Sequence, residues 1–251
     1  MTRLALAAWL VACAAHAAPL RLMLSIGHDE GQLGDAPLRY AQTDAQRVRD
    51  VFVELGSVKA ADAELVVGRA APDVEAALAR LASRVEAARA EQREVVVFVY
   101  VSSHASAGVL HLGESGLSLA ALREAVARMP ASLRVLVVDA CSSGAIVRQK
   151  GGQRATPSVT LGATPTRGTV VISSSGPVEA AQEWEALTSS LFTHHWLAAL
   201  RGRADVNRDG RVSLNEAYAY ASAQTVATAA QHPAYELELS GSTEVCLLYT
   251  S

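Results

Sequence analysis

The sequence has few cysteines, and their placement offers no disulfide framework. Its 251 residues contain three, Cys13, Cys141 and Cys246. Cys13 lies in an N-terminal segment typical of an export signal, and Cys246 lies in a terminal stretch that we expect to be foreign. Cys141 is then a single thiol in an exported protein, and an odd thiol there indicates reactivity rather than cross-linking. We therefore expect Cys141 to be a reactive group.

Other absences narrow the function further. The formal net charge is −3, with 22 Lys and Arg against 25 Asp and Glu, and no basic cluster is present that would attract nucleic acid. The sequence has no G-x-S-x-G motif, which disfavours a serine hydrolase of the α/β-hydrolase kind. Beyond the N-terminal segment, no apolar run is long enough for a transmembrane helix. We expect neither a nucleic-acid partner nor an organic cofactor.

Residues 1–17 have the pattern of a signal peptide. Arg3 is followed by the apolar run Leu4–Val11, which is too short to span a bilayer, and small residues favour cleavage after Ala17. The alternative is a lipoprotein signal, because Leu10-Val11-Ala12-Cys13 resembles a lipoprotein box in which Cys13 is acylated. Both alternatives predict an exported protein, periplasmic or secreted, attached to a membrane only if Cys13 carries lipid.

Residues 246–251 read Cys-Leu-Leu-Tyr-Thr-Ser. Reverse translation of this stretch gives a DNA sequence resembling a transposon end that is ligated to DNA in one common sequencing-library method. We expect the native chain to be truncated near Val245 and these residues to be a non-native tail. The alternative is a genuine terminal strand that ends in Cys-Leu-Leu.

Residues 18–245, about 230 residues, are enough for one α/β domain with a sizeable core. Apolar runs typical of buried strands alternate with segments whose apolar residues recur at helical spacing. The predicted strands are Leu20–Ile26, Ala63–Val67, Glu94–Val101, Leu133–Asp139 and Thr169–Ser173, and the predicted helices are Tyr40–Leu55, Pro72–Ala90, Leu119–Met129, Leu187–Leu200 and Leu214–Ala230. Such alternation is typical of a mostly parallel sheet with helices on both faces. We therefore predict a three-layer α/β/α sandwich.

A histidine and a cysteine follow two of these predicted strands. His104 comes shortly after Glu94–Val101, and Cys141 shortly after Leu133–Asp139. Neighbouring parallel strands lie about 4.8 Å apart, so side chains just beyond their carboxyl ends can converge. Either residue alone is more simply explained as a buried structural Cys or a hydrogen-bonded loop His. Together they predict a thiol nucleophile whose proton is taken by the imidazole.

The segments around these residues resemble a known family. Y-V-S-S-H-A and V-V-D-A-C-S-S-G resemble the histidine and cysteine segments of the caspase-like cysteine peptidases, in particular their metacaspase-like bacterial branch. L-R-Y-A-Q-T-D-A resembles the entry to the first helix of that family. The resemblance implies a caspase-like fold and endopeptidase activity on peptide or protein substrates. It implies that His104 is the general base, that Cys141 is the nucleophile, and that the backbone N–H groups of Ala105 and Cys141 form the oxyanion hole.

The same resemblance implies a substrate-binding pocket built from Asp139, Asp44 and Ser102. A buried carboxylate requires a cationic partner, so acidic residues there imply Arg or Lys as the P1 residue, on the amino side of the cleaved bond. Without the resemblance, Asp44 is more simply a carboxylate at a helix start, stabilised by the helix dipole. For Asp139 the alternative is a turn former at the end of a strand.

The sequence departs from the family pattern on both sides of the histidine. Ser103 and Ala105 occupy positions where the family has glycine. A Cβ matters at such a position if the backbone needs a positive φ or must approach the substrate closely. These departures leave a second interpretation open, in which the chain is a catalytically weak caspase-fold protein that serves as a binding or signalling module.

Residues 205–216 fit the EF-hand calcium loop, and they lie between two predicted helices as an EF-hand requires. Gly210 occupies the position of the sharp turn. The predicted calcium ligands are Asp205, Asn207, Asp209, the backbone carbonyl of Arg211, Ser213 and Glu216. The alternative is a glycine turn followed by a capping box, because Ser213-x-x-Glu216 is also that motif. We favour Ca²⁺.

A Gly-, Thr- and Pro-rich connector, Ala145–Arg167, follows the cysteine segment. Its composition is typical of an exposed loop that a protease can cut. Its basic residues are Arg148, Lys150, Arg154 and Arg167. If the pocket accepts basic P1 residues, these are the nearest candidate sites for self-processing. The alternative is an uncut surface loop.

Overall fold

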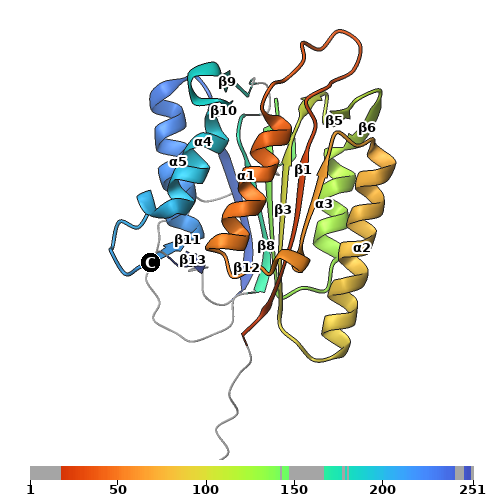
Figure 1. Ribbon diagram of the computed structural model, residues 1–251, viewed down its shortest axis with the longest axis vertical. Helices are drawn as coiled ribbons and strands as arrows, with labels where there is room; N and C mark the ends of the chain where they lie inside the picture. Colours follow the sequence, from red (N-terminus) through yellow and green to blue (C-terminus); the bar gives the residue numbers. More distant parts are fainter. Residues whose placement is uncertain are drawn as a thin grey trace, which may run out of the picture.

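A six-stranded sheet forms the middle layer of the protein (Figure 1). The structure, a computed structural model, describes residues 18–141, 143–146, 167–176, 179, 181–240 and 246–249. The strand order is β12-β8-β7-β3-β1-β2. These strands are β1 (Leu20–Gly27), β2 (Ala63–Val67), β3 (Val95–Ser102), β7 (Leu133–Asp139), β8 (Arg167–Ser173) and β12 (Ala234–Ser240). Neighbouring strands run parallel except for β12, which pairs antiparallel with β8.

Helices cover both faces of this sheet, as Figure 1 shows. One face carries α1 (Ala41–Glu54), α4 (Leu191–Ala198) and α5 (Leu214–Thr228), and the other carries α2 (Ala71–Ala90) and α3 (Leu119–Arg128). A hydrophobic core lies on each face of the sheet, and successive side chains of a strand point alternately into the two cores. In β3, Val97 and Val99 pack in the core under α2 and α3, whereas Phe98 and Tyr100 pack in the core under α1, α4 and α5. The predicted three-layer α/β/α sandwich is confirmed.

The predicted helix Leu187–Leu200 differs most from what the structure contains. Its first residues instead form β10 (Ser189–Ser190), which pairs antiparallel with β9 (Glu183–Trp184). Helix α4 then begins at Leu191 because the Ser190 hydroxyl accepts the N–H of Thr193 as an N-cap. Beyond α4 the chain widens into a π-helical turn, η4 (Ala199–Arg203). The short helices η1 (Ala60–Asp62), η2 (Ser143–Ile146) and η3 (Glu185–Leu187) complete the described helices.

The carboxyl ends of β1, β3 and β7 meet at one edge of the sheet. Gly27 is paired with Ser102, and Ser102 is paired with Asp139. A side chain at Gly27 would place its Cβ 2.5 Å from the carbonyl oxygen of Ala41, so only glycine lets α1 pack this closely on β1. A small antiparallel sheet follows β3 at the same edge. It consists of β4 (His104–Ser106), β5 (Val109–Leu112) and β6 (Ser115–Ser118).

The last described residues form a strand, β13 (Cys246–Tyr249), which pairs antiparallel with β11 (Arg211–Ser213). Leu247 and Leu248 are fully buried in the core under α1, α4 and α5. The Arg21 guanidinium donates to the carbonyl oxygen of Leu247 over 2.7 Å. Residues 246–249 of the stretch predicted to be a foreign tail therefore form a strand, with Leu247 and Leu248 packed in the core.

The export signal predicted for residues 1–17 lies outside the described residues, as does most of the connector after the cysteine segment. Within the described ranges, every helix is too short or too polar to span a bilayer.

Candidate active site

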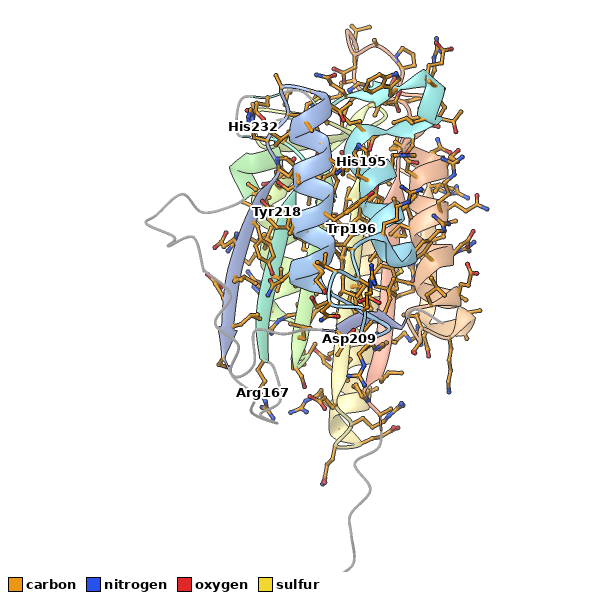
Figure 2. The ribbon with its side chains drawn as sticks, turned by 90° about the vertical axis from the view of Figure 1, so that its left-hand side faces the viewer. Arg167, His195, Trp196, Asp209, Tyr218 and His232 are labelled. Atoms are coloured by element: carbon orange, nitrogen blue, oxygen red, sulfur yellow. The ribbon has the colours of Figure 1, made fainter. Side chains whose placement is uncertain are left out.

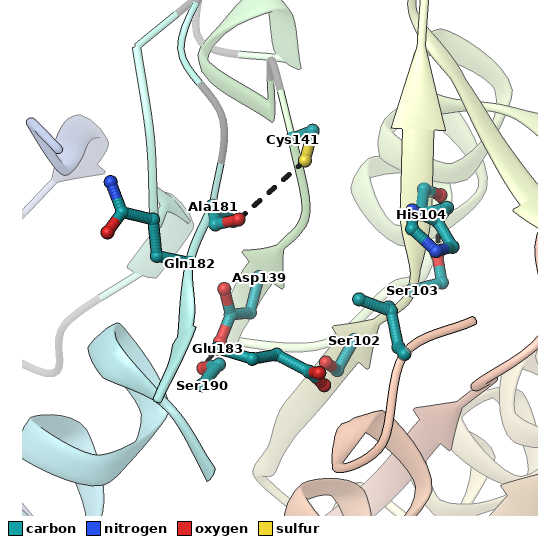
Figure 3. A pocket seen from close by; sticks show the side chains of 10 residues that line it. Ser102, Ser103, His104, Asp139, Cys141, Ala181, Gln182, Glu183 and Ser190 are labelled. Carbon is teal, nitrogen blue, oxygen red and sulfur yellow. Dashed lines mark hydrogen bonds between the residues drawn. The ribbon is translucent and has the colours of Figure 1, made fainter. Parts of the chain in front are cut away.

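A pocket opens at the carboxyl edge of the sheet, between the ends of β3 and β7 (Figure 3). Four of the predicted site residues line it: Ser102, His104, Asp139 and Cys141. Its other lining residues are Leu38, Ser103, Ala181, Gln182, Glu183 and Ser190. The pairing of β3 with β7 brings the histidine and cysteine segments together, because each segment leaves its strand at the same level of the sheet.

The His104 imidazole is held by a backbone carbonyl. Its Nε2 lies 2.6 Å from the carbonyl oxygen of Ala36, in the loop between β1 and α1. A carbonyl oxygen only accepts hydrogen bonds, so Nε2 must carry the proton in this contact. In the neutral ring Nδ1 is then the free base. The contact with Ala36 thus selects the nitrogen that can take a proton from a nucleophile.

Cys141 is half-buried at the opposite side of the pocket mouth, as the close view in Figure 3 shows. Its thiol donates to the carbonyl oxygen of Ala181, with an Sγ–O distance of 3.8 Å. Burial raises the pKa of this thiol, and the negative charges of Asp139 and Asp35 act in the same direction. The resting sulfur is therefore a neutral thiol, and making the thiolate requires a base.

Asp139 is fully buried below Cys141. Its Oδ2 accepts hydrogen bonds from the hydroxyls of Ser190 and Thr193, the latter over 2.6 Å. Its Oδ1 has no hydrogen bond of normal geometry among the described residues, and the Ser174 hydroxyl is likewise unpaired there. Burial raises the pKa of Asp139, while the hydroxyls of Ser190, Thr193 and Ser174 act in the opposite direction. An unpartnered carboxylate oxygen in a pocket wall is costly, and a cationic group in the pocket would relieve that cost.

Asp44 lies behind the pocket wall rather than in the lining. Its carboxylate accepts the Ser189 hydroxyl and the Ser190 N–H, both over 2.8 Å. Burial raises the pKa of Asp44 to about 7, and the charge of Asp139 contributes in the same direction. Arg47 lies 3.6 Å from the Asp44 carboxylate and lowers that pKa again. Asp44 therefore contacts a pocket-lining residue, Ser190, without lining the pocket itself.

The two departures from glycine beside His104 are accommodated by the backbone. Neither Ser103 nor Ala105 has a positive φ; the positive φ values in this hairpin are those of Ala107, 48°, and Gly108, 78°, in the turn from β4 to β5. The Ser103 hydroxyl donates to the carbonyl oxygen of His104 over 3.0 Å. The φ values of Ser103 and Ala105 thus do not require glycine at either position.

Three residues of the site, Ala36, Ala181 and Ser190, are absent from the residues predicted from the sequence. Ala36 and Ala181 contribute only carbonyl oxygens. Ser190 holds Asp139 through its side chain and Asp44 through its backbone. Only Ser190 has a recognisable sign in the sequence, because Ser190-Leu-Phe-Thr193 is an N-cap pattern at the start of an apolar helix.

The loop 205–216 lies at the other end of α4 from the pocket, and Figure 2 labels its Asp209. The Asp205 carboxylate accepts the N–H groups of Asp209 and Gly210, each over 3.1 Å. Arg208 and Gly210 have positive φ. The loop therefore turns sharply around the Asp205 side chain, and Gly210 occupies the turn that the calcium motif assigns to glycine.

The other predicted ligands of this loop make local hydrogen bonds. The Asn207 side-chain oxygen accepts the Asp209 N–H over 2.9 Å. Glu216 accepts the N–H and hydroxyl of Ser213, each over 2.9 Å, and completes a capping box on α5. In the described ranges, no three His, Cys, Asp or Glu side chains gather as a metal site. The loop has the oxygen donors that Ca²⁺ prefers, and Oε2 of Glu216 is engaged by Ser213.

Comparisons with known proteins agree with this architecture. Residues 20–241 match the family described as the caspase domain. The structure is similar to the crystal structure of caspase-1 from Spodoptera frugiperda, with a TM-score of 0.63 and 14% sequence identity over 92% of this chain and 90% of that chain. At this identity the structural likeness establishes the fold alone. No curated protein sequence matches the chain.

Proposed function

This chain belongs to the caspase domain family of cysteine peptidases, and we propose that it is an exported endopeptidase that cleaves after Arg or Lys and binds calcium. The observation that carries the proposal is the pocket at the sheet edge, where Cys141, His104 and a buried carboxylate, Asp139, line one cavity. Chemistry at that edge is typical of open α/β sheets.

The proposed reaction uses the free nitrogen of His104. Nδ1 takes the proton of the Cys141 thiol, and the thiolate attacks the carbonyl carbon of the scissile bond. The backbone N–H groups of Cys141 and Ala105 stabilise the oxyanion of the tetrahedral intermediate. The imidazolium then protonates the leaving amine, and a water molecule, activated by the same nitrogen, hydrolyses the thioester. The Ala36 carbonyl keeps Nε2 occupied throughout.

The proposed P1 preference rests on the acids of the pocket. Asp139 lines the cavity, and one of its carboxylate oxygens has no partner among the described residues; Asp44 adds a second buried carboxyl behind Ser190. A guanidinium or ammonium group would supply hydrogen bonds to Asp139 and offset one negative charge of this acidic pair. A P1 aspartate would place a further carboxyl group beside the two buried acids, so cleavage after Asp is not expected.

Calcium binding is proposed for residues 205–216. Asp205, Asn207 and Asp209 already surround one turn, and Ser213 and Glu216 follow at the start of α5. Carboxylate, amide and carbonyl oxygens are the ligands that Ca²⁺ takes. Glu216 would exchange its capping bonds with Ser213 for coordination, so binding stabilises the loop at the expense of one cap.

One observation favours the second candidate function, a binding module with weak catalysis. The Cys141 thiol donates to Ala181 instead of to an imidazole, and burial keeps its pKa high. An enzyme would have to break this contact when substrate binds. A binding module could keep the contact and still hold a basic peptide side chain against Asp139.

The deciding experiment uses matched fluorogenic peptides that differ only at P1, with Arg, Lys, Ala or Asp. We expect the wild-type protein to cleave the Arg and Lys peptides and the Cys141→Ala variant to cleave none. His104→Ala should lose most of the activity, because His104 is the base proposed to take the thiol proton.

Cys246→Ala is the matched control, because it removes the other described thiol, which lies on β13 away from the pocket. It should keep full activity. Cleavage that survives in Cys141→Ala contradicts the mechanism. Binding of the Arg peptide by wild-type protein, without any cleavage, supports the binding-module alternative.

A further inference from the structure

An acid–imidazole pair, with a buried imidazole and a half-buried carboxylate, lies next to the His104 contact and has no part in the reaction described so far. The Asp35 carboxylate accepts the Nδ1–H of His111, with an Oδ2–Nδ1 distance of 2.6 Å. The His111 ring is nearly buried, and its Nε2 lies 2.9 Å from the Ser106 hydroxyl. Both ring nitrogens of His111 are therefore bonded, which fixes the orientation of the ring.

This pair joins the two segments that hold His104. His111 on β5 is the cross-strand partner of His104 on β4. Asp35 directly precedes Ala36, whose carbonyl oxygen bonds His104 Nε2. Two consecutive residues of the β1–α1 loop thus bond the hairpin: Asp35 through its side chain and Ala36 through its carbonyl oxygen. Because the two residues are adjacent, a change in one contact is expected to shift the other.

The Asp35 side chain is itself fixed within its loop. Its Oδ2 also accepts the N–H of Gln32 over 2.7 Å. A Cβ at Gly31 would come within 2.2 Å of that oxygen, so glycine is needed for the loop to close on the carboxylate. The carboxylate therefore occupies one position, set by a tight turn on one side and an imidazole on the other.

The hydrogen bond from His111 lowers the pKa of the Asp35 carboxyl group below its ordinary value. The Asp35 carboxylate also interacts electrostatically with both proposed catalytic residues. It interacts with His104, and it contributes to the raised pKa of the Cys141 thiol.

We propose that Asp35 and His111 are positioning residues for His104: together they hold the Ala36 carbonyl against Nε2 and so keep Nδ1 free to act as the base. This inference rests on the proposed function for its catalytic meaning. The positioning itself does not depend on it, because the tautomer of His104 is a property of the resting protein.

The test is the tautomer of His104, read from long-range ¹⁵N–¹H NMR spectra of the imidazole nitrogens. We expect the Nε2–H form in the wild-type protein and a mixture of tautomers in Asp35→Ala and in His111→Ala. Asp35→Asn keeps an acceptor for Gln32 while removing the charge, so it should fall between wild type and Asp35→Ala, and it guards against an Asp35→Ala protein that does not fold.

Activity on the Arg peptide gives a second readout. The single variants should lose about tenfold to a hundredfold in kcat with little change in KM, because a misplaced base affects the chemical step. The double variant should be no worse than either single variant, since the pair acts as a unit. Asp29→Asn is the matched control, because Asp29 lies in the same loop but its side chain accepts the N–H of Gln42. The His104 tautomer in this variant should match that of the wild-type protein.

Two outcomes separate this inference from the proposed function. If His104 keeps the Nε2–H form in folded Asp35→Asn and His111→Ala proteins, the positioning role is overturned whatever the activity. If the tautomer shifts in these variants while the wild-type protein cleaves no peptide, the positioning role stands and the endopeptidase function fails.

Discussion

Asp44 and Asp139 are joined through a single residue, because Ser190 donates its N–H to Asp44 and its hydroxyl to Asp139. Two buried carboxyl groups thus share one donor residue at the base of the candidate pocket. Each is destabilised as a charge by burial, and Asp139 further raises the pKa of Asp44. The two carboxyl groups are therefore electrostatically coupled, since the charge of Asp139 raises the pKa of Asp44.

The first prediction concerns stability against pH. The pKa of Asp44 is about 7 in the folded protein, against an ordinary value of 3.8 for an unfolded chain, so between these values the folded state holds a proton that the unfolded state has lost. Stability from this group is therefore present below the lower pKa and falls as pH rises toward the upper one, by about 1.4 kcal/mol for each pH unit in that interval. Asp44→Asn should remove this loss.

We expect Asp44→Asn to melt at a higher temperature than wild type at pH 8, with a difference that shrinks toward pH 4. The substituted amide can still accept the Ser190 N–H and donate to the Ser189 hydroxyl, so the packing is kept. Asp50→Asn, at an exposed position on the same helix, is the control and should show no such trend. A difference in melting temperature between Asp44→Asn and wild type that stays constant from pH 4 to pH 8 would contradict the prediction.

The second prediction concerns Asp139. Asp139→Ala should reduce kcat/KM for the P1 Arg peptide by the equivalent of about 2–5 kcal/mol, the usual cost of removing one partner of a buried charge pair. Alkylation of Cys141 by iodoacetamide should continue in this variant, because the thiol and its base are kept. Equal turnover of P1 Arg and P1 Asp peptides by the wild-type protein is the result that rules out an acidic pocket.

The third prediction concerns calcium. Binding to the folded state alone stabilises a protein by about 2.7 kcal/mol when the free ion is a hundredfold above Kd. We expect a higher melting temperature in Ca²⁺ than in EGTA, and Glu216→Gln should lose most of that difference. Glu75→Gln on α2, an exposed glutamate far from the loop, should respond to Ca²⁺ as wild type does. Coincident wild-type curves with and without Ca²⁺ exclude the site.

The fourth prediction is self-processing after the cysteine segment. Arg148, Lys150 and Arg154 lie outside the described residues, and Arg167 is the first residue of β8. Purified protein should convert with time into two fragments, with a new N-terminus between residues 149 and 168, while Cys141→Ala stays whole. A cut elsewhere, or an equal cut in the Cys141→Ala protein, would show that this loop is not a substrate.

The fifth prediction concerns the last six residues. Leu247 and Leu248 are fully buried against the core, and burying a leucine contributes about 1.5–3 kcal/mol. Deletion of residues 246–251 should therefore lower the melting temperature if the strand forms in solution. An unchanged melting temperature would be the result expected of a foreign tail, and sequencing the 3′ end of the gene tests the same question independently.

The strands of the sheet can be predicted where they are continuous apolar runs. Ala63–Val67 and Leu133–Asp139 have the predicted bounds. Strand β12 is absent from the predicted strands although Tyr235, Leu237 and Leu239 alternate with polar residues, which is the pattern of an edge strand exposed on one face. Strands β4, β5 and β6 are too short to show a period, and the turns that join them, not their apolar residues, define them.

The candidate site can be predicted only where its residues follow strands, as His104 and Cys141 do. The carbonyl of Ala36 cannot be predicted, because a backbone acceptor has no sequence signature. The contact of Asp35 with His111 joins segments that are distant in the sequence, and a lone histidine in a loop does not indicate its partner.

Ser102 and Asp139 are paired, yet a three-stranded hairpin sheet and helix α3 separate them along the chain. The candidate nucleophile and its base therefore meet only after β7 has docked beside β3, which is a non-local contact. A nascent chain that has not yet emerged as far as residue 141 has no complete pocket, and neither has a chain held unfolded. Any activity of this pocket therefore depends on the central sheet having formed, because the β3–β7 pairing is what brings its two sides together.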